Sequence, residues 1–101
     1  MSDALQELLA KVEAGEASTM RFEDCGFDGW AELAYHGSLD AARALHEAHL
    51  SHHYAQLHMW PMPEMTRVDI GGGHVGRDAI PARAWLIAIL RAMIEQRGEP
   101  K

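Results

Sequence analysis

Hydrophobic positions are most closely spaced between Ile80 and Ile94, and this stretch predicts a long final helix. Pro81 stands in the first turn, where a helix needs no N–H donor, and Asp78 precedes it as a candidate cap. On a helix drawn at about 100° per residue, large apolar side chains fill most of the circumference and leave a narrow polar stripe of Arg91 and Glu95. Such a helix is covered on more than one side, so we expect it to lie at the centre of the core.

Two amphipathic helices are predicted upstream. The first lies between Ser2, a candidate cap, and Gly15, which is placed to end it. Its core face repeats at helical spacing through Leu5, Leu8, Leu9 and Val12. The second helix runs from Leu39 to Leu50, with Ser38 as its candidate cap. Its apolar arc consists of Leu39, Ala42, Leu45 and Leu50.

Alternating patterns predict two strands, at 54–60 and 66–70. The apolar side of the first strand consists of Ala55, Leu57 and Met59. Because the connection between the two stretches is short, we expect an antiparallel hairpin. Two strands alone are only marginally stable, so a third is expected from either Trp30–Tyr35 or His74–Ile80. The first of these stretches is equally compatible with a helical turn.

The order of these elements predicts an α+β domain in which a small antiparallel sheet of two to three strands packs with about three helices. A chain of 101 residues with 48% apolar content is long enough to form one core without disulfides, so a single domain is expected over 1–101. Residues 1–33 are expected to form an acidic N-terminal helix and an irregular segment. Residues 34–97 are expected to form a helix–hairpin–helix core.

The negative charge is concentrated in the first third of the chain. Up to Glu32 there are eight acidic residues against two basic ones, which accounts for the whole net charge of −6. Because nucleic-acid binding depends on Lys and Arg that neutralise phosphates, this balance argues against direct binding of DNA or RNA. An acidic flank fits a basic protein surface, and the alternative is a solvated surface that only favours solubility.

Cysteine usage and hydropathy indicate in which compartment of the cell the protein is expected. The single cysteine, Cys25, has no partner for a disulfide, and no targeting signal opens the chain. We therefore expect a cytoplasmic protein. The longest apolar run, from Ala84 to Leu90, is far shorter than the ~20 residues of a membrane span, so no membrane is expected as a partner.

Two stretches and a tryptophan-containing strand stand out as a set. The stretches are Ala34–Leu45, which contains Tyr-x-x-Ser-x-Asp-Ala-Ala, and Pro81–Ala92, and the tryptophan is Trp60. Together they resemble the phage ABA-sandwich domain family. The resemblance covers roughly residues 34–94, and the histidine-rich segment from Leu50 to His58 and the triple glycine depart from it. It implies a phage-derived accessory protein with α/β/α layering and transfers no catalytic residues.

The histidines are the sharpest chemical feature. Spacing at i, i+3 and i+7 aligns His46, His49 and His53 on one helical face, and imidazoles grouped in this way bind zinc, nickel or copper. No Cys, Asp or Glu joins the repeat at ligand spacing, and the helix is expected to end before His53. The alternative is that these imidazoles pack at the margin of the core and form hydrogen bonds. We expect no cofactor and treat the three histidines as weak metal candidates.

Catalytic and nucleotide-binding motifs have little support. Gly71–Gly76 formally matches G-x-G-x-x-G, but no second parallel strand with an acidic residue follows the final helix. Nothing in the sequence places Cys25 beside a histidine base, and hydrolase and metalloprotease motifs are missing. An enzyme is therefore not expected.

The sequence instead favours a protein that binds other proteins. The segment from Met59 to Met65 is rich in methionine and contains a tryptophan, and both residue types are common at protein interfaces. The alternative is that this connection folds onto its own core. Candidate partner-binding residues are Glu23, Asp24, Asp28, Glu32, Trp60, Met62 and Met65.

The functional hypothesis is a non-enzymatic, phage-derived accessory protein that binds a host protein or protein complex. Its most specific form is a counter-defence (anti-CRISPR-like) inhibitor whose acidic surface occupies a basic groove of a nucleic-acid-handling complex. One alternative is a metal-binding module built from the histidine cluster. The other is a structural homodimer that buries Trp60 or Trp85.

Overall fold

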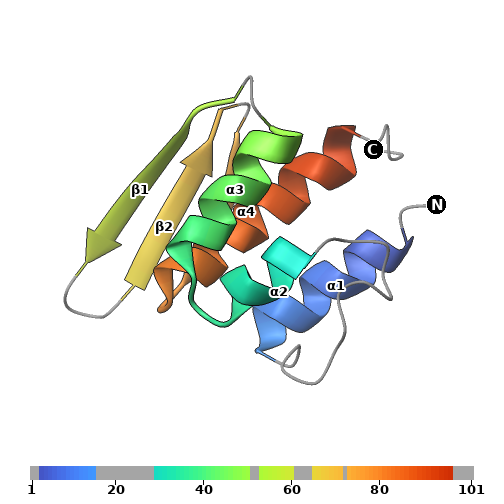
Figure 1. The fold of residues 1–101 in the computed structure, drawn as a ribbon, viewed down its shortest axis with the longest axis horizontal. Helices are drawn as coiled ribbons and strands as arrows, with labels where there is room; N and C mark the ends of the chain where they lie inside the picture. The colour runs from blue at the N-terminus through green and yellow to red at the C-terminus, as the bar shows by residue number, and fades with distance from the viewer. Residues whose placement is uncertain (1–2, 16–28, 51–52, 61–64, 72, 97–101) are drawn as a thin grey trace.

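The computed structural model describes residues 3–15, 29–50, 53–60, 65–71 and 73–96, and it has an α+β fold (Figure 1). The elements are α1 (Asp3–Ala14), α2 (Gly29–Tyr35), α3 (Leu39–His49), β1 (Ala55–Trp60), β2 (Met65–Ile70), β3 (His74–Asp78) and α4 (Pro81–Gln96). The three strands form one antiparallel sheet in the order β1-β2-β3. The predicted fold class is confirmed, with four helices in place of about three.

Helix α4 lies at the centre of the core, as its apolar circumference predicts. It packs against β2 and β3 on one side and contacts α1, α2 and α3 as well. Leu86, Ile87, Ile89 and Leu90 are buried together on it. The candidate cap Asp78 acts just before the helix: its carboxylate accepts a hydrogen bond from the Ile80 N–H at 2.9 Å. The side chain therefore fixes the turn that leads into α4.

The ends of α1 and α3 follow their predicted signals. Gly15 adopts a left-handed φ of 73° after α1, and its N–H donates to the Val12 carbonyl. The Ser38 hydroxyl accepts a hydrogen bond from the Ala41 N–H at 3.1 Å, as an N-terminal cap does. Ser2, the predicted cap of α1, and the predicted loop at 16–28 lie outside the described residues.

The two alternatives for the third strand are resolved. Residues 30–35 belong to α2, with Ala31, Ala34 and Tyr35 buried at helical spacing. The third strand is β3, which ends at Asp78 because the turn to α4 begins there. No helix in the described part of the chain is long and apolar enough to cross a membrane.

The arrangement of helices and sheet differs from the α/β/α layering that the family resemblance implies. All four helices lie on the same side of the sheet in Figure 1. Thr66, Val68 and Ile70 of β2 point toward them and are buried, whereas the alternate residues Arg67 and Asp69 are partly exposed. In the described residues the sheet therefore lies at one side of the molecule, and an α/β/α order with a central sheet is not seen.

Gly76 sets the distance between the sheet and α4. A Cβ atom built on Gly76 would lie 2.1 Å from the Ala84 carbonyl oxygen and 2.6 Å from the Ala88 backbone nitrogen. Real Cβ atoms essentially never approach backbone atoms so closely. The helix thus rests directly on the backbone of β3, and only glycine permits this contact.

We expect Gly76→Ala to lower the free energy of unfolding by about 3 kcal/mol, because the added methyl group meets backbone atoms that cannot rotate away. Gly71→Ala is the matched control, since its Cβ would meet only the side chain of Tyr54, which is exposed and free to move. That variant should lose less than about 1 kcal/mol. Urea unfolding of both variants measures the difference, and equal losses would contradict the close contact.

Candidate functional site

The β1–β2 hairpin exposes apolar side chains on its outer strand. The register pairs Leu57 with Val68 and Met59 with Thr66, so both side chains lie on the helix-facing side of the sheet, as their alternation predicts. They are nevertheless 37% and 64% exposed, because α4 lies mainly over β2 and β3. The apolar side of β1 is therefore largely uncovered by the described residues.

The predicted partner-binding residues of the hairpin are partly placed. Met65 begins β2 and is exposed, and the register sets it opposite Trp60 at the end of β1. The side chain of Trp60 and the whole of Met62 lie outside the described residues. Sequence reasoning placed Leu57 and Met59 on the core side of a strand, and it included Met59 in a possible interface only through the segment from Met59 to Met65. The signal that would have found them is that one central helix cannot cover a sheet of three strands.

No strand in the described part of the chain pairs with the outer edge of β1. The Gly71 N–H donates to the Tyr54 carbonyl at 2.9 Å, so the even-numbered residues of β1 are the ones that bond to β2. Ala55, Leu57 and Met59 therefore direct their N–H and C=O groups away from the sheet. β1 contains no Pro, Lys or Glu, which commonly protect edge strands.

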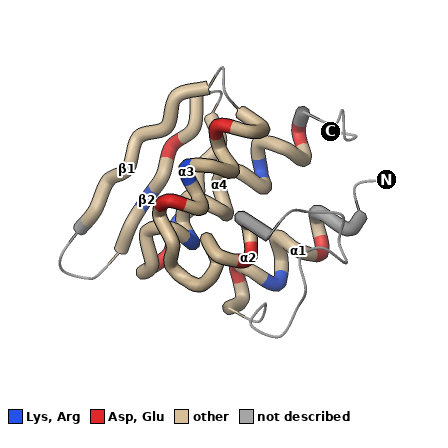
Figure 2. Tube along the Cα trace, viewed as in Figure 1, with Lys and Arg blue, Asp and Glu red and all other residues tan. Residues whose placement is uncertain are grey.

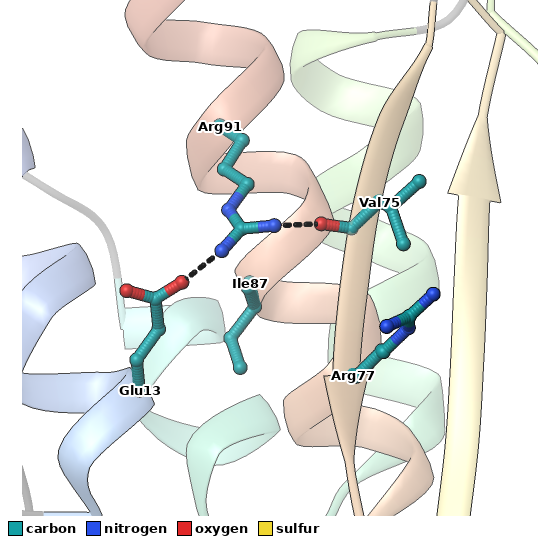
Figure 3. A pocket seen from close by; sticks show the side chains of 5 residues that line it. All are labelled: Glu13, Val75, Arg77, Ile87 and Arg91. Atoms are coloured by element: carbon teal, nitrogen blue, oxygen red, sulfur yellow. Dashed lines mark hydrogen bonds and ion pairs between the residues drawn. The ribbon is translucent and has the colours of Figure 1, made fainter.

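The opposite edge of the sheet is covered. Arg91 of α4 donates to the Val75 carbonyl of β3 at 2.5 Å and also forms an ion pair with Glu13 of α1 (Figure 3). These contacts border an open pocket of about 430 Å³ whose lining residues are Glu13, Val75, Arg77, Ile87 and Arg91. Because Arg91 already contacts a carboxylate and a carbonyl, it offers little to a further anion. The contacts at this edge hold α1 and α4 to β3.

The predicted acidic surface lies mostly outside the described residues. Glu23, Asp24 and Asp28 fall within 16–28, and Glu32 lies partly buried on α2. Figure 2 shows further acidic positions on α1 and α3, while β1 has no charged residue. The described acidic residues of α1, α2 and α3 therefore lie on other elements than the edge strand β1.

His46 has a structural partner at each ring nitrogen. The indole N–H of Trp85 donates to its Nδ1 at 3.3 Å, and its Nε2 lies 2.7 Å from the His53 carbonyl oxygen. An indole N–H only donates, so Nδ1 is the acceptor, and Nε2 carries the hydrogen and donates to the carbonyl. The ring is buried and joins α3, α4 and the segment before β1.

The other metal candidates do not complete a site. His49 is exposed at the end of α3, and His53 lies beyond that helix with its Nδ1 buried and unpartnered among the described residues. The three rings therefore do not share one helical face. Within the residues that the structure describes, no three His, Cys, Asp or Glu side chains are close enough to hold a metal ion.

Three polar side chains on the outer face of the sheet contact one another. On the face of the sheet away from the helices, Asp69 contacts Arg67 at 3.0 Å and His58 at 3.3 Å. The glycine-rich motif at 71–76 spans the connection between the antiparallel strands β2 and β3 and the first three residues of β3. This geometry agrees with the sequence argument against a dinucleotide-binding turn, which needs a strand followed by a helix.

We expect His46→Ala to lower the free energy of unfolding by about 2 kcal/mol. The Trp85 N–H and the His53 carbonyl would both lose the imidazole of His46 as their partly buried hydrogen-bond partner. His49→Ala is the control on the exposed end of the same helix and should cost less than about 1 kcal/mol. Urea unfolding with and without Zn²⁺ measures both effects. A zinc-dependent gain in stability that His46→Ala abolishes would instead indicate a ligand role.

Comparison with protein-family models, with curated proteins and with solved structures found no match to this chain.

Proposed function

We propose that this protein has no catalytic role and acts by binding another protein through the β1–β2 hairpin. The observation that carries this proposal is the exposure of Leu57 and Met59 on an uncovered edge strand. Exposed apolar side chains grouped on one surface are typical of interaction sites, and methionine adapts readily to the shape of a partner. Met65 extends this surface to the other face of the hairpin.

The more specific form of the proposal is a phage-derived accessory protein that inhibits a host nucleic-acid-handling complex. The resemblance of residues 34–94 to phage ABA-sandwich domains supports the origin. The acidic first third supports the mode of action, because carboxylates compete for a basic groove that otherwise binds phosphates. Exposed Glu7 of α1 adds to the negative charge of Glu23, Asp24, Asp28 and Glu32.

The hairpin is tested by affinity capture from bacterial lysate with the tagged full chain, followed by mass spectrometry. We expect the wild type to recover one complex stoichiometrically and Met59→Lys to recover less than about a tenth of it, since a charge is then buried at the contact. Leu33→Lys is the matched control, because Leu33 is an exposed apolar residue on α2, away from the hairpin. If both variants lose the captured complex equally, or if neither variant loses it, a contact at the hairpin is contradicted.

The acidic surface is tested separately with a variant in which Glu23, Asp24, Asp28 and Glu32 are changed to Gln or Asn. Loss of four carboxylates should weaken binding to the captured complex on the order of 10-fold at low salt and flatten its dependence on salt. Binding measured between about 50 and 500 mM NaCl gives both numbers. Unchanged affinity and an unchanged salt dependence would remove the electrostatic part of the proposal and leave the hairpin contact in place.

A further inference from the structure

We infer that the outer edge of β1 pairs with β1 of a second copy of this chain, antiparallel and centred on Leu57. This inference rests on the proposed function, since it names a partner for the same hairpin. The inference also goes beyond the proposed function, because it specifies the register of the paired strands and the symmetry of the pair. Three observations support it: the backbone groups of β1, the contrast with the edge of β3, and the side chains that the pairing brings together.

The first observation is that β1 offers a regular set of backbone groups. Ala55, Leu57 and Met59 point their N–H and C=O groups away from β2. A second strand satisfies such groups more completely than a side chain does, because its own groups have the same spacing. The matching ladder is available on another copy without any change in fold.

The second observation is that, among the described residues, the edge of β3 already has a partner at Val75 and the edge of β1 has none. On β3 the Val75 carbonyl already accepts from Arg91, and Glu13 holds that guanidinium in place. An incoming strand would have to break these contacts. On β1 no described group occupies the edge, and the strand contains no Lys, Arg, Asp or Glu to repel its own copy.

The third observation is the register. A two-fold axis perpendicular to the sheet keeps the helices of both copies on one side and pairs odd residues with odd residues. With Leu57 on the axis, Leu57 meets its own copy and Ala55 meets Met59, so every outward group of the strand is paired. If the two strands slide by two residues in either direction, Ala55 or Met59 no longer has a partner in β1 of the other copy.

The side chains are complementary in this register. On the helix side, the two Leu57 side chains meet at the axis, and the large Met59 lies next to the small Ala55. On the other side, Gln56 lies opposite His58, which pairs two polar side chains. Tyr54, which is 67% exposed, falls opposite Trp60. No like charges face each other, so the edge is self-complementary.

The mass of the full chain in solution tests the inference. Sedimentation equilibrium over a concentration series should show a mass that rises from that of the monomer toward twice that value. Leu57→Lys places two charges together at the axis and should raise the dissociation constant on the order of 100-fold. Leu33→Lys, with the same change on α2, should leave it unchanged. A monomer at every concentration, or a dimer unaffected by Leu57→Lys, overturns the inference.

Cross-linking tests the register in a Cys25→Ser background, where no native thiol interferes. Leu57→Cys should form an intermolecular disulfide under mild oxidation, because each substituted residue lies opposite its own copy. Met59→Cys is the control. Residue 59 lies on the same side of the same strand, but in this register it faces Ala55 of the second copy. The substituted residue of that copy lies four positions away along the strand. Equal cross-linking of both variants overturns the register.

The result also separates this inference from the proposed function. If the wild type stays monomeric while Met59→Lys still loses its captured complex, the edge serves a different protein and only the second-copy inference fails. If the protein dimerises through β1 and captures nothing else, self-association is the function of the hairpin and the proposed host partner fails.

Discussion

The direct contact between α4 and the backbone of β3 at Gly76 is the constraint on which the rest of the structure depends. It brings the most apolar helix of the chain onto two of the three strands and leaves its other sides for α1, α2 and α3. Each of these helices then needs only one apolar face, which is the pattern that α1 and α3 have. Arg91, on the remaining polar stripe of α4, connects this core to α1 through Glu13.

The same contact determines which part of the sheet stays uncovered. A single helix about 10 Å wide covers roughly two strands spaced 4.7–4.9 Å apart, so a third strand extends beyond it. That strand is β1, and its apolar side follows the pattern of a buried strand without being buried. The exposure of Leu57 and Met59 is therefore a consequence of how α4 is seated and needs no special feature of β1 itself.

The sequence predicted the structural features that depend on residues close together in the chain. Ser38 and Gly15 marked helix ends because caps act within one turn, and alternation identified β1 and β2 because side chains alternate along any strand. It left open what depends on distant residues. Residues 30–35 formed a helix because α3 and α4 cover Ala31 and Ala34, and the partner of His46 is Trp85, which lies in a different helix. No local pattern contains these contacts.

The two proposed binding surfaces should respond to salt in opposite directions, because the charge of the chain is unevenly placed. Two copies that each carry a net charge of −6 repel one another at long range, although the β1 strands that meet contain no Lys, Arg, Asp or Glu. Added salt screens this repulsion and favours pairing of the copies. An acidic surface bound to a basic groove is attracted at long range, and the same salt weakens it. A protein with both surfaces therefore favours self-pairing at high salt and a basic partner at low salt.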